Sequence, residues 1–228
     1  MDTLRLKAGS NFKKCVKGYH MLNDTPITGR CWEDINSIVL TTSGYQVHNQ
    51  SDGSHKSGKD ITSSLGDLSN KSAKYTRGNK PLKISSYRLG KISSAIAPGD
   101  VKDIVTAIND KKNFEFYSVI ARAQTKKDLH YDWYLIPSDF PALDPRIYEW
   151  RHTYGRDGKM SGWETNTING SCMSVRFSLA SELWISLNLT DEVKNFIVSS
   201  CDVNIGKQLN YIQFYEDTVD NLPLINLT

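Results

Sequence analysis

The sequence predicts an α/β fold, because segments with helical periodicity alternate with segments that resemble strands. Residues 30–44 and 98–110 place apolar side chains at helical spacing, whereas residues 114–124 and 130–137 are rich in aromatic and β-branched residues. With 228 residues the chain can bury a full hydrophobic core. We therefore expect a single domain over residues 1–228.

The composition is that of a water-soluble protein, with 39% hydrophobic and 23% charged residues. No apolar run approaches the roughly 20 residues of a membrane-spanning helix, so no membrane association is expected. The opening residues include no apolar segment long enough for a signal peptide. The 4 cysteines lack the CxxC spacing of zinc sites, which favours free thiols in a reducing cytoplasm.

The first expected elements are a helix over residues 30–44 and a short strand at "GYQVH". Trp32, Ile35 and Val39 fall on one face of this helix, and Gly44 is a typical helix stop. The helix is therefore amphipathic, with its apolar face directed at the core.

A β-hairpin is expected next, over residues 59–75. Gly66 and Asp67 are the natural two-residue turn between its strands. This turn would set the register so that Asp60 lies opposite Ala73.

In that register Asp60, Ser69 and Lys71 project from the same face of the hairpin, because opposite residues share a face. Asp60 and Lys71 become diagonal neighbours, about 7–8 Å apart at their backbones. The other face carries apolar side chains, namely Ile61, Leu65 and Leu68. Two interpretations follow: a catalytic pair, or an ordinary cross-strand ion pair on a wet sheet face.

The catalytic interpretation is phosphodiester hydrolysis. Mg²⁺ needs only one or two carboxylates together with phosphate oxygens and waters, and it acidifies a bound water for attack. Asp60 would bind the metal, and Lys71 would position the water and stabilise developing charge.

The remaining elements follow in chain order. A second helix is expected over residues 98–110, and two strong strands over residues 114–124 and 130–137, separated by the polar turn "TKKD". Beyond residue 141 the patterns predict a helical turn at "DPRIYEW", strands at "SCMSVRFSL" and "ELWISLNL", and a capped helix at "TDEVKNFIVSSC".

This order of helix, strand, hairpin, helix and strand, with "GKDI" followed by "LSNKSAKY", resembles the PD-(D/E)xK nuclease core over about residues 30–137. The run "HKSGKDI…LSNKSAK…ISSYRL" resembles type II restriction endonucleases in particular. The resemblance implies a mixed central β-sheet flanked by helices, with residues 138–228 as a mostly β extension for DNA recognition and dimerisation. It also implies Mg²⁺ as cofactor, double-stranded DNA as substrate and a homodimer.

The motif departs from the family pattern at two positions. A lysine precedes Asp60 where proline is expected, and Ser69 stands where the second acidic residue is expected. Some members of the class recruit an acid from the preceding helix, and Glu33 fits that position better than Asp34. The resemblance therefore implies Asp60, Ser69, Lys71 and Glu33 as catalytic residues, with Asp60 and Glu33 binding the metal.

Lys74 offers a rival S-x-K in a shifted register, but it would face the apolar side of the hairpin. Positive charge is concentrated around this segment: residues 56–91 include nine lysines and arginines against two aspartates, a difference of seven. Residues 149–171 add arginines, a lysine and glycines suited to DNA contact. The expected DNA-binding residues are His55, Lys56, Lys74, Arg88, Arg151, Arg156 and Lys159.

Two alternatives stay open. A catalytically silent nucleic-acid-binding protein could use the same basic hairpin for phosphates alone, without a metal. A repair or junction nuclease would prefer branched DNA to a short target sequence.

Overall fold

The computed structural model describes residues 3–50, 58–75, 81–89, 101–125, 128–177 and 181–204. Its helices are α1 (Thr3–Leu22), α2 (Gly29–Ser43), α3 (Val101–Lys111) and the single turn α4 (Asp191–Lys194). Its strands are β1 (Val47–Gln50), β2 (Ile61–Ser63), β3 (Gly66–Lys74), β4 (Leu82–Arg88), β5 (Phe116–Gln124), β6 (Asp128–Pro137), β7 (Trp150–Tyr154), β8 (Met160–Thr165), β9 (Cys172–Arg176), β10 (Glu182–Leu187) and β11 (Ile197–Asn204). No helix among these segments has the length and apolar character needed to cross a membrane.

The described strands all belong to one mixed sheet. Its order is β11-β6-β5-β3-β4-β10-β9-β8-β7, and β2 pairs with both β1 and β3. β3 and β5 run parallel, while the other described pairings are antiparallel. A mixed sheet with a few helices agrees with the predicted α/β class.

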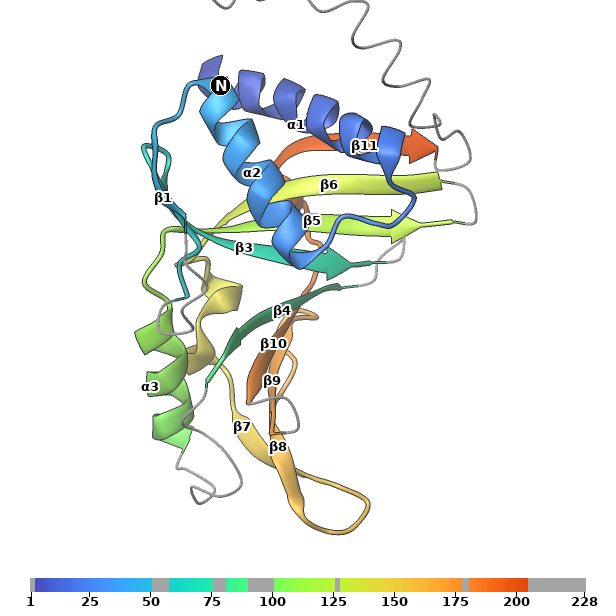
Figure 1. The fold of residues 1–228 in the computed structure, drawn as a ribbon. Coiled ribbons are helices and arrows are strands. Elements are labelled where there is room, and N and C mark those ends of the chain that lie inside the picture. Colours follow the sequence, from blue (N-terminus) through green and yellow to red (C-terminus); the bar gives the residue numbers. More distant parts are fainter. Residues whose placement is uncertain are drawn as a thin grey trace, which may run out of the picture.

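The sheet divides into two parts at the junction of β3 and β4. The strands β4, β10, β9, β8 and β7, here called the arm, turn away from the rest of the sheet (Figure 1). α1 and α2 cover one face of the other part, which consists of β3, β5, β6 and β11 (Figure 1). The helices and the arm therefore use different faces of the central strands.

Each face of β5 and β6 is buried in its own core. On the helical face, Phe12 of α1 and Trp32 of α2 pack around Trp133 of β6. On the other face, Val119 and Tyr134 join a second cluster that includes α3 and the inner side of the arm. This burial on both faces explains why β5 and β6 read as the strongest strands in the sequence.

α2 confirms the predicted helix of residues 30–44. Trp32, Ile35 and Val39 are buried, and Gly44 ends the helix with φ 104°, the left-handed conformation that glycine tolerates best. By contrast, α1 was not predicted from the sequence. Few of its residues are buried, and its amphipathic pattern is weak because lysines and two glycines lie between the apolar residues.

The predicted register of the hairpin is wrong. β2 and β3 pair Ile61 with Leu68 and Ser63 with Gly66, so Ser64 and Leu65 form the turn. Gly66 is instead the first residue of β3, where its φ is 128° and a Cβ would lie 2.3 Å from Glu115 Oε2. The glycine is required by this positive φ at the start of β3, since the Glu115 carboxylate ends a flexible side chain that could move.

The shift leaves the shared face unchanged. Asp60 now lies beside Ser69 in place of Ala73, because its backbone N–H donates to Leu68 O at 2.8 Å. The partner of Asp60 has moved by four residues, an even number, so Asp60, Ser69 and Lys71 still project from one face.

The later elements differ more from expectation. α3 confirms the second helix, although residues 98–100 of that segment lie outside the described residues. β9 and β10 confirm two predicted strands, and a 3₁₀ turn at Pro145–Ile147 confirms the helical turn. The segment expected to be a capped helix forms only the turn α4 before it continues as β11. Thr190 does cap that turn by accepting a hydrogen bond from Val193 N, but the β-branched run that follows pairs with β6.

Candidate active site

The predicted catalytic residues lie where the sheet forks beside β3. β5 pairs with one edge of β3 from Leu68 to Lys74. On the opposite edge, β2 pairs only as far as Leu68 and β4 begins to pair only at Ala73, so the described strands leave residues 69–72 unpaired there. Figure 1 shows β4 diverging from β3 toward the start of that strand.

Asp60 occupies this fork. Its Oδ2 accepts hydrogen bonds from Asn70 N at 2.6 Å and from Lys71 Nζ at 3.1 Å, and Ser69 Oγ lies 3.3 Å away. Among the described residues, no hydrogen bond reaches Oδ1. Asp60 therefore keeps one carboxylate oxygen for a further ligand.

Lys71 contacts Asp60 directly and is more enclosed than the acid. The two side chains are 12% and 19% exposed for Lys71 and Asp60, respectively. Lys71 Nζ also donates to Asn70 O at 2.9 Å. An ammonium group has three donors, so within the described part of the chain one N–H of Lys71 has no acceptor.

Ser69 lies beside Asp60 but is fully buried. Its hydroxyl donates to Gly58 O at 2.5 Å, which fixes the chain just before Asp60. A buried neutral hydroxyl in this position supports the carboxylate and does not replace the acidic residue that the family pattern expects.

Glu33 is close enough to this pair to interact with it electrostatically. Burial on α2 raises the pKa of Glu33, the negative charge of Asp60 raises the pKa further, and Lys71 opposes the shift. Asp34, the less favoured acid, is exposed on the neighbouring position of the helix. The structure thus places Asp60, Ser69 and Lys71 in contact, with Glu33 within electrostatic range of Asp60 and Lys71.

The residues fit a divalent cation that takes most of its ligands from elsewhere. Within the described segments no group of three or more histidine, cysteine or acidic side chains could bind a metal. Asp60 and Glu33 supply two carboxylates, and Mg²⁺ needs only one or two when phosphate oxygens and waters complete its shell.

Asn36 and Asn70 form a buried contact that was not predicted from the sequence. Asn36 Nδ2, on α2, donates to Asn70 Oδ1 of β3 at 2.6 Å and to Ser118 Oγ of β5 at 2.9 Å. Asn36 follows Glu33 by three residues, so both lie on adjacent positions of one helical face. A polar residue among the apolar positions of the helix was the available signal.

The predicted DNA-binding residues are dispersed. Lys74, the rival S-x-K lysine, is exposed at the end of β3, opposite Lys83 of β4. Arg88 is exposed at the end of β4. His55 and Lys56 lie outside the described residues.

The other three candidates belong to the β7–β8 hairpin. Arg151 Nη2 forms an ion pair with Glu164 Oε1 at 2.7 Å across the two strands. Arg156 and Lys159 lie in the exposed turn, where Lys159 is 3.9 Å from Asp157. None of these cations contacts the Asp60–Lys71 pair, so any part they take in binding DNA is separate from the reacting groups.

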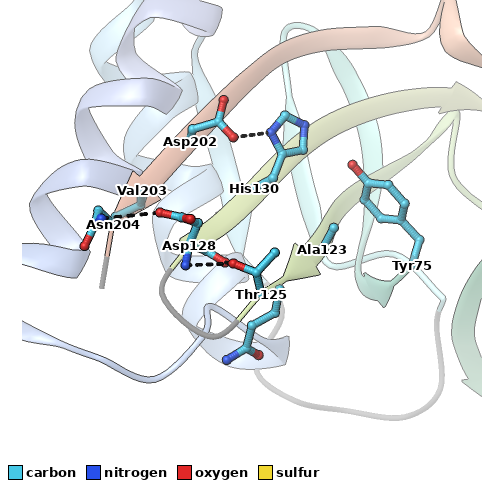
Figure 2. A pocket seen from close by; sticks show the side chains of 9 residues that line it. Tyr75, Ala123, Thr125, Asp128, His130, Asp202, Val203 and Asn204 are labelled. Atoms are coloured by element: carbon cyan, nitrogen blue, oxygen red, sulfur yellow. Dashed lines mark hydrogen bonds and ion pairs between the residues drawn. The ribbon is translucent and has the colours of Figure 1, made fainter. Parts of the chain in front are cut away.

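A second polar cluster lines a cavity of about 580 Å³ at the ends of β3, β5, β6 and β11 (Figure 2). His130 lies between two carboxylates, with Nδ1 2.8 Å from Asp202 Oδ1 and Nε2 3.0 Å from Asp132 Oδ1. Tyr75 donates to the other oxygen of Asp132 at 2.5 Å. Among the described lining residues His130 is the only basic side chain, and Asp128 adds further negative charge, so the cluster is a poor site for a phosphodiester.

Comparisons of the chain with protein-family models, with curated proteins and with solved structures return no match. The site geometry and the sequence pattern are therefore the basis for a functional proposal.

Proposed function

We propose that this chain is a Mg²⁺-dependent endonuclease that hydrolyses phosphodiester bonds of double-stranded DNA, in the manner of a type II restriction enzyme. The observation that supports this most is the direct contact of Asp60 with Lys71 at the open edge of β3, with Glu33 beside them. An acid and an ammonium group held together in a partly open fork are the groups that metal-assisted phosphodiester hydrolysis requires.

Each residue has a distinct part in the proposed reaction. Asp60, through its unengaged Oδ1, and Glu33 would bind Mg²⁺, which supplies an acidified water and neutralises phosphate charge. Lys71 directs its unused N–H toward a phosphate oxygen and orients the attacking water. Ser69 and Asn70 hold the acid and the lysine in place through the main chain.

The partners follow from the same proposal. A two-fold homodimer would allow each subunit to cut one strand of a palindromic site. The arm and the segment after residue 138 would supply recognition and dimerisation, in the cytoplasm where DNA is accessible.

Plasmid cleavage tests the proposal. Wild-type protein with Mg²⁺ should give discrete fragments, and EDTA should abolish them. Lys71→Ala and Asp60→Asn should each lower the cleavage rate by about 10²–10⁴-fold, since each removes a group that acts on the reacting water or phosphate. Both variants should still unfold in a cooperative thermal transition, at a lower midpoint than wild type because each weakens a hydrogen bond to the Asn70 main chain.

Lys59→Ala is the matched control. Lys59 lies next to Asp60 in the chain but pairs with Asp67 at 3.0 Å, so its loss should leave cleavage nearly unchanged. Intact plasmid in the presence of Mg²⁺ despite measurable DNA binding would refute the nuclease.

A silent nucleic-acid-binding protein is the second candidate, and one observation favours it. Asp60 and Lys71 satisfy the main-chain N–H and C=O of Asn70, a purely structural use of both charges. Such a protein would bind DNA equally well in EDTA and after Asp60→Asn. Branched substrates in the same assay would identify the third candidate, a repair or junction nuclease.

A further inference from the structure

The outer face of the arm has a regular arrangement of polar side chains. β4, β10 and β9 lie side by side, and alternate residues are buried in the core on their inner side, namely Leu82, Ile84, Met173, Val175, Leu183, Ile185 and Leu187. The intervening residues therefore point outward, and the register places them in cross-strand rows.

Three rows can be read from the pairing. At one end, Glu182 lies opposite Arg88 of β4 and Arg176 of β9 in the strand register. In the middle row Trp184 lies between Ser85 and Ser174, and in the last row Ser186 lies between Lys83 and Cys172. A single large aromatic side chain thus stands at the centre of a polar surface.

The charge of this surface is positive. Lys83, Arg88 and Arg176 surround Trp184, and all three side chains are exposed. The nearby acid Glu182 accepts a short hydrogen bond from Ser85, and Glu164 on β8 is paired with Arg151. This surface therefore has four cations, counting Arg151, and two acids. Each acid already has a partner, Ser85 for Glu182 and Arg151 for Glu164.

Trp184 also lines a concavity. Together with Lys83, Arg176 and the small polar residues beside them, it borders a cavity of about 350 Å³, a size within the range of ligand pockets. The indole Nε1 finds no acceptor among the described residues. The Nε1 atom is itself buried, while the half-buried side chain as a whole borders the cavity.

We propose that this outer face binds an unpaired nucleic-acid strand, with one base stacked on Trp184 and the neighbouring phosphates on Lys83 and Arg176. Lys83 and Arg176 lie on opposite sides of β10 and are in register with residues four positions apart along it. With strands about 4.8 Å apart and a rise of about 3.3 Å per residue, their backbones are about 16 Å apart, on either side of the ring. Phosphate-binding cations around an aromatic platform are the two components of single-strand binding sites.

An unpaired strand fits better than a duplex because stacking on the indole needs a base whose face is uncovered, and in a duplex both faces are stacked on neighbours. This surface lies on the outer side of the arm, whereas Asp60 and Lys71 lie at the fork beside β3. The proposal does not depend on the cleavage chemistry.

Tryptophan fluorescence provides a specific readout. Of the five tryptophans, Trp32, Trp133, Trp150 and Trp163 are at most 9% exposed, so Trp184 is the accessible one. The wild-type protein is titrated with oligo-dT or oligo-U of 15 nucleotides in EDTA, in parallel with a 15-base-pair DNA duplex. We expect quenching by the single strands and weaker binding of the duplex.

Trp184→Ala should abolish the quenching and weaken binding, measured by anisotropy of a labelled strand, by about 5- to 150-fold. Trp184→Phe should retain part of the affinity. Lys83→Ala and Arg176→Ala remove exposed side chains, and each should reduce the dependence of binding on salt. Lys14→Ala, an exposed change on α1, is the control and should bind as wild type does.

Three results would overturn the proposal: no quenching by either single strand, unchanged affinity in Trp184→Ala, or equal affinity for the duplex. Asp60→Asn separates this test from that of the nuclease. It should bind the single strand normally, so loss of cleavage alone leaves the strand-binding surface intact.

Discussion

Asp60 and Lys71 complete the hydrogen bonds of the Asn70 main chain at an edge of β3 that has no described strand partner. The carboxylate accepts from Asn70 N and the ammonium donates to Asn70 O, at 2.6 Å and 2.9 Å. An unpaired strand edge is a liability in a folded protein, and here two charged side chains protect it. The residues proposed for catalysis therefore also stabilise the sheet.

Glu33 should show a conflict between stability and function. Burial and the charge of Asp60 raise its pKa above the ordinary value of 4.5, so the folded state favours the protonated acid. Glu33 therefore contributes stability that is fully present at pH values below the ordinary pKa. This contribution is lost as the pH rises through the raised pKa of the folded state. Glu33→Gln should therefore unfold at a higher urea concentration than wild type at pH 8, and the difference should shrink at pH 4. The same variant should lose about 10–100-fold in the rate of Mg²⁺-dependent cleavage.

Asp34→Asn is the matched control for Glu33→Gln, because Asp34 is exposed on the same turn of α2. It should change neither the urea midpoint nor the cleavage rate appreciably. A Glu33→Gln protein less stable than wild type at pH 8 would contradict the assignment of Glu33 to the fork.

For single residues, the sequence could predict which side chains share a face of the hairpin. It could not predict the strand register or the contacts with the Asn70 main chain. The common face of Asp60, Ser69 and Lys71 depends only on the two-residue period of strands, and so it survives an error in register. The predicted register depended on Gly66 as a turn residue, whereas its positive φ serves the start of β3 after a turn at Ser64 and Leu65. The protection of Asn70 depends on where β2 and β4 diverge, which no local pattern reveals.

α2 and β3 are joined by the buried contact between Asn36 and Asn70. A side-chain hydrogen bond between a helix and a strand fixes the rotation of the helix about its axis, in a way that apolar packing does not. Because Glu33 is three residues before Asn36, this contact sets how closely Glu33 approaches Asp60.

Asn36→Ala should therefore affect both folding and the site. It removes two buried hydrogen bonds and leaves Asn70 Oδ1 without a partner, which should lower the free energy of unfolding by about 1–3 kcal/mol. The Mg²⁺ concentration for half-maximal cleavage should also rise, since Glu33 loses its fixed position. Thr41→Ala, an exposed change on α2, should leave both quantities unchanged; an unaltered Mg²⁺ midpoint in Asn36→Ala would refute the positioning.

The helices and strands that were predicted from the sequence are those with one buried face or with both faces buried. α2, α3, β5 and β6 have strong periodicity or continuous apolar runs, and all four are confirmed. α1 was missed because few of its residues are buried, and β4 was missed as well. The segment after Thr190 was predicted to be a helix because Thr190 is a helix cap. Local sequence does not indicate that the residues after this turn pair with β6.

At the scale of the whole molecule, the described residues form two hydrophobic cores that share one set of strands. Ile120 of β5 belongs to the core beneath the helices, and its neighbours Val119 and Ala121 belong to the core beneath the arm. Neither core can lose its packing without exposing the strands that form the other. Such sharing favours cooperative unfolding.

Urea unfolding should accordingly be a single transition. Far-UV circular dichroism and tryptophan fluorescence should give the same midpoint, because Trp32 and Trp133 report on one core and Trp150 and Trp163 on the other. Lys14→Ala serves as a control for surface changes. Two separated transitions would show that the arm unfolds independently of the helical part.

The packing of α1 on β11 has a consequence for synthesis. Ser199 Oγ donates to Gly9 O across 190 positions of the chain, and a Cβ at Gly9 would lie 3.2 Å from Val198 O. Phe12 and Val16 on α1 therefore emerge from the ribosome long before the strand against which the helix packs. Pairing over such a sequence distance is slow, and apolar surface exposed meanwhile invites aggregation. Production of this protein should then depend on translation rate and chaperone supply.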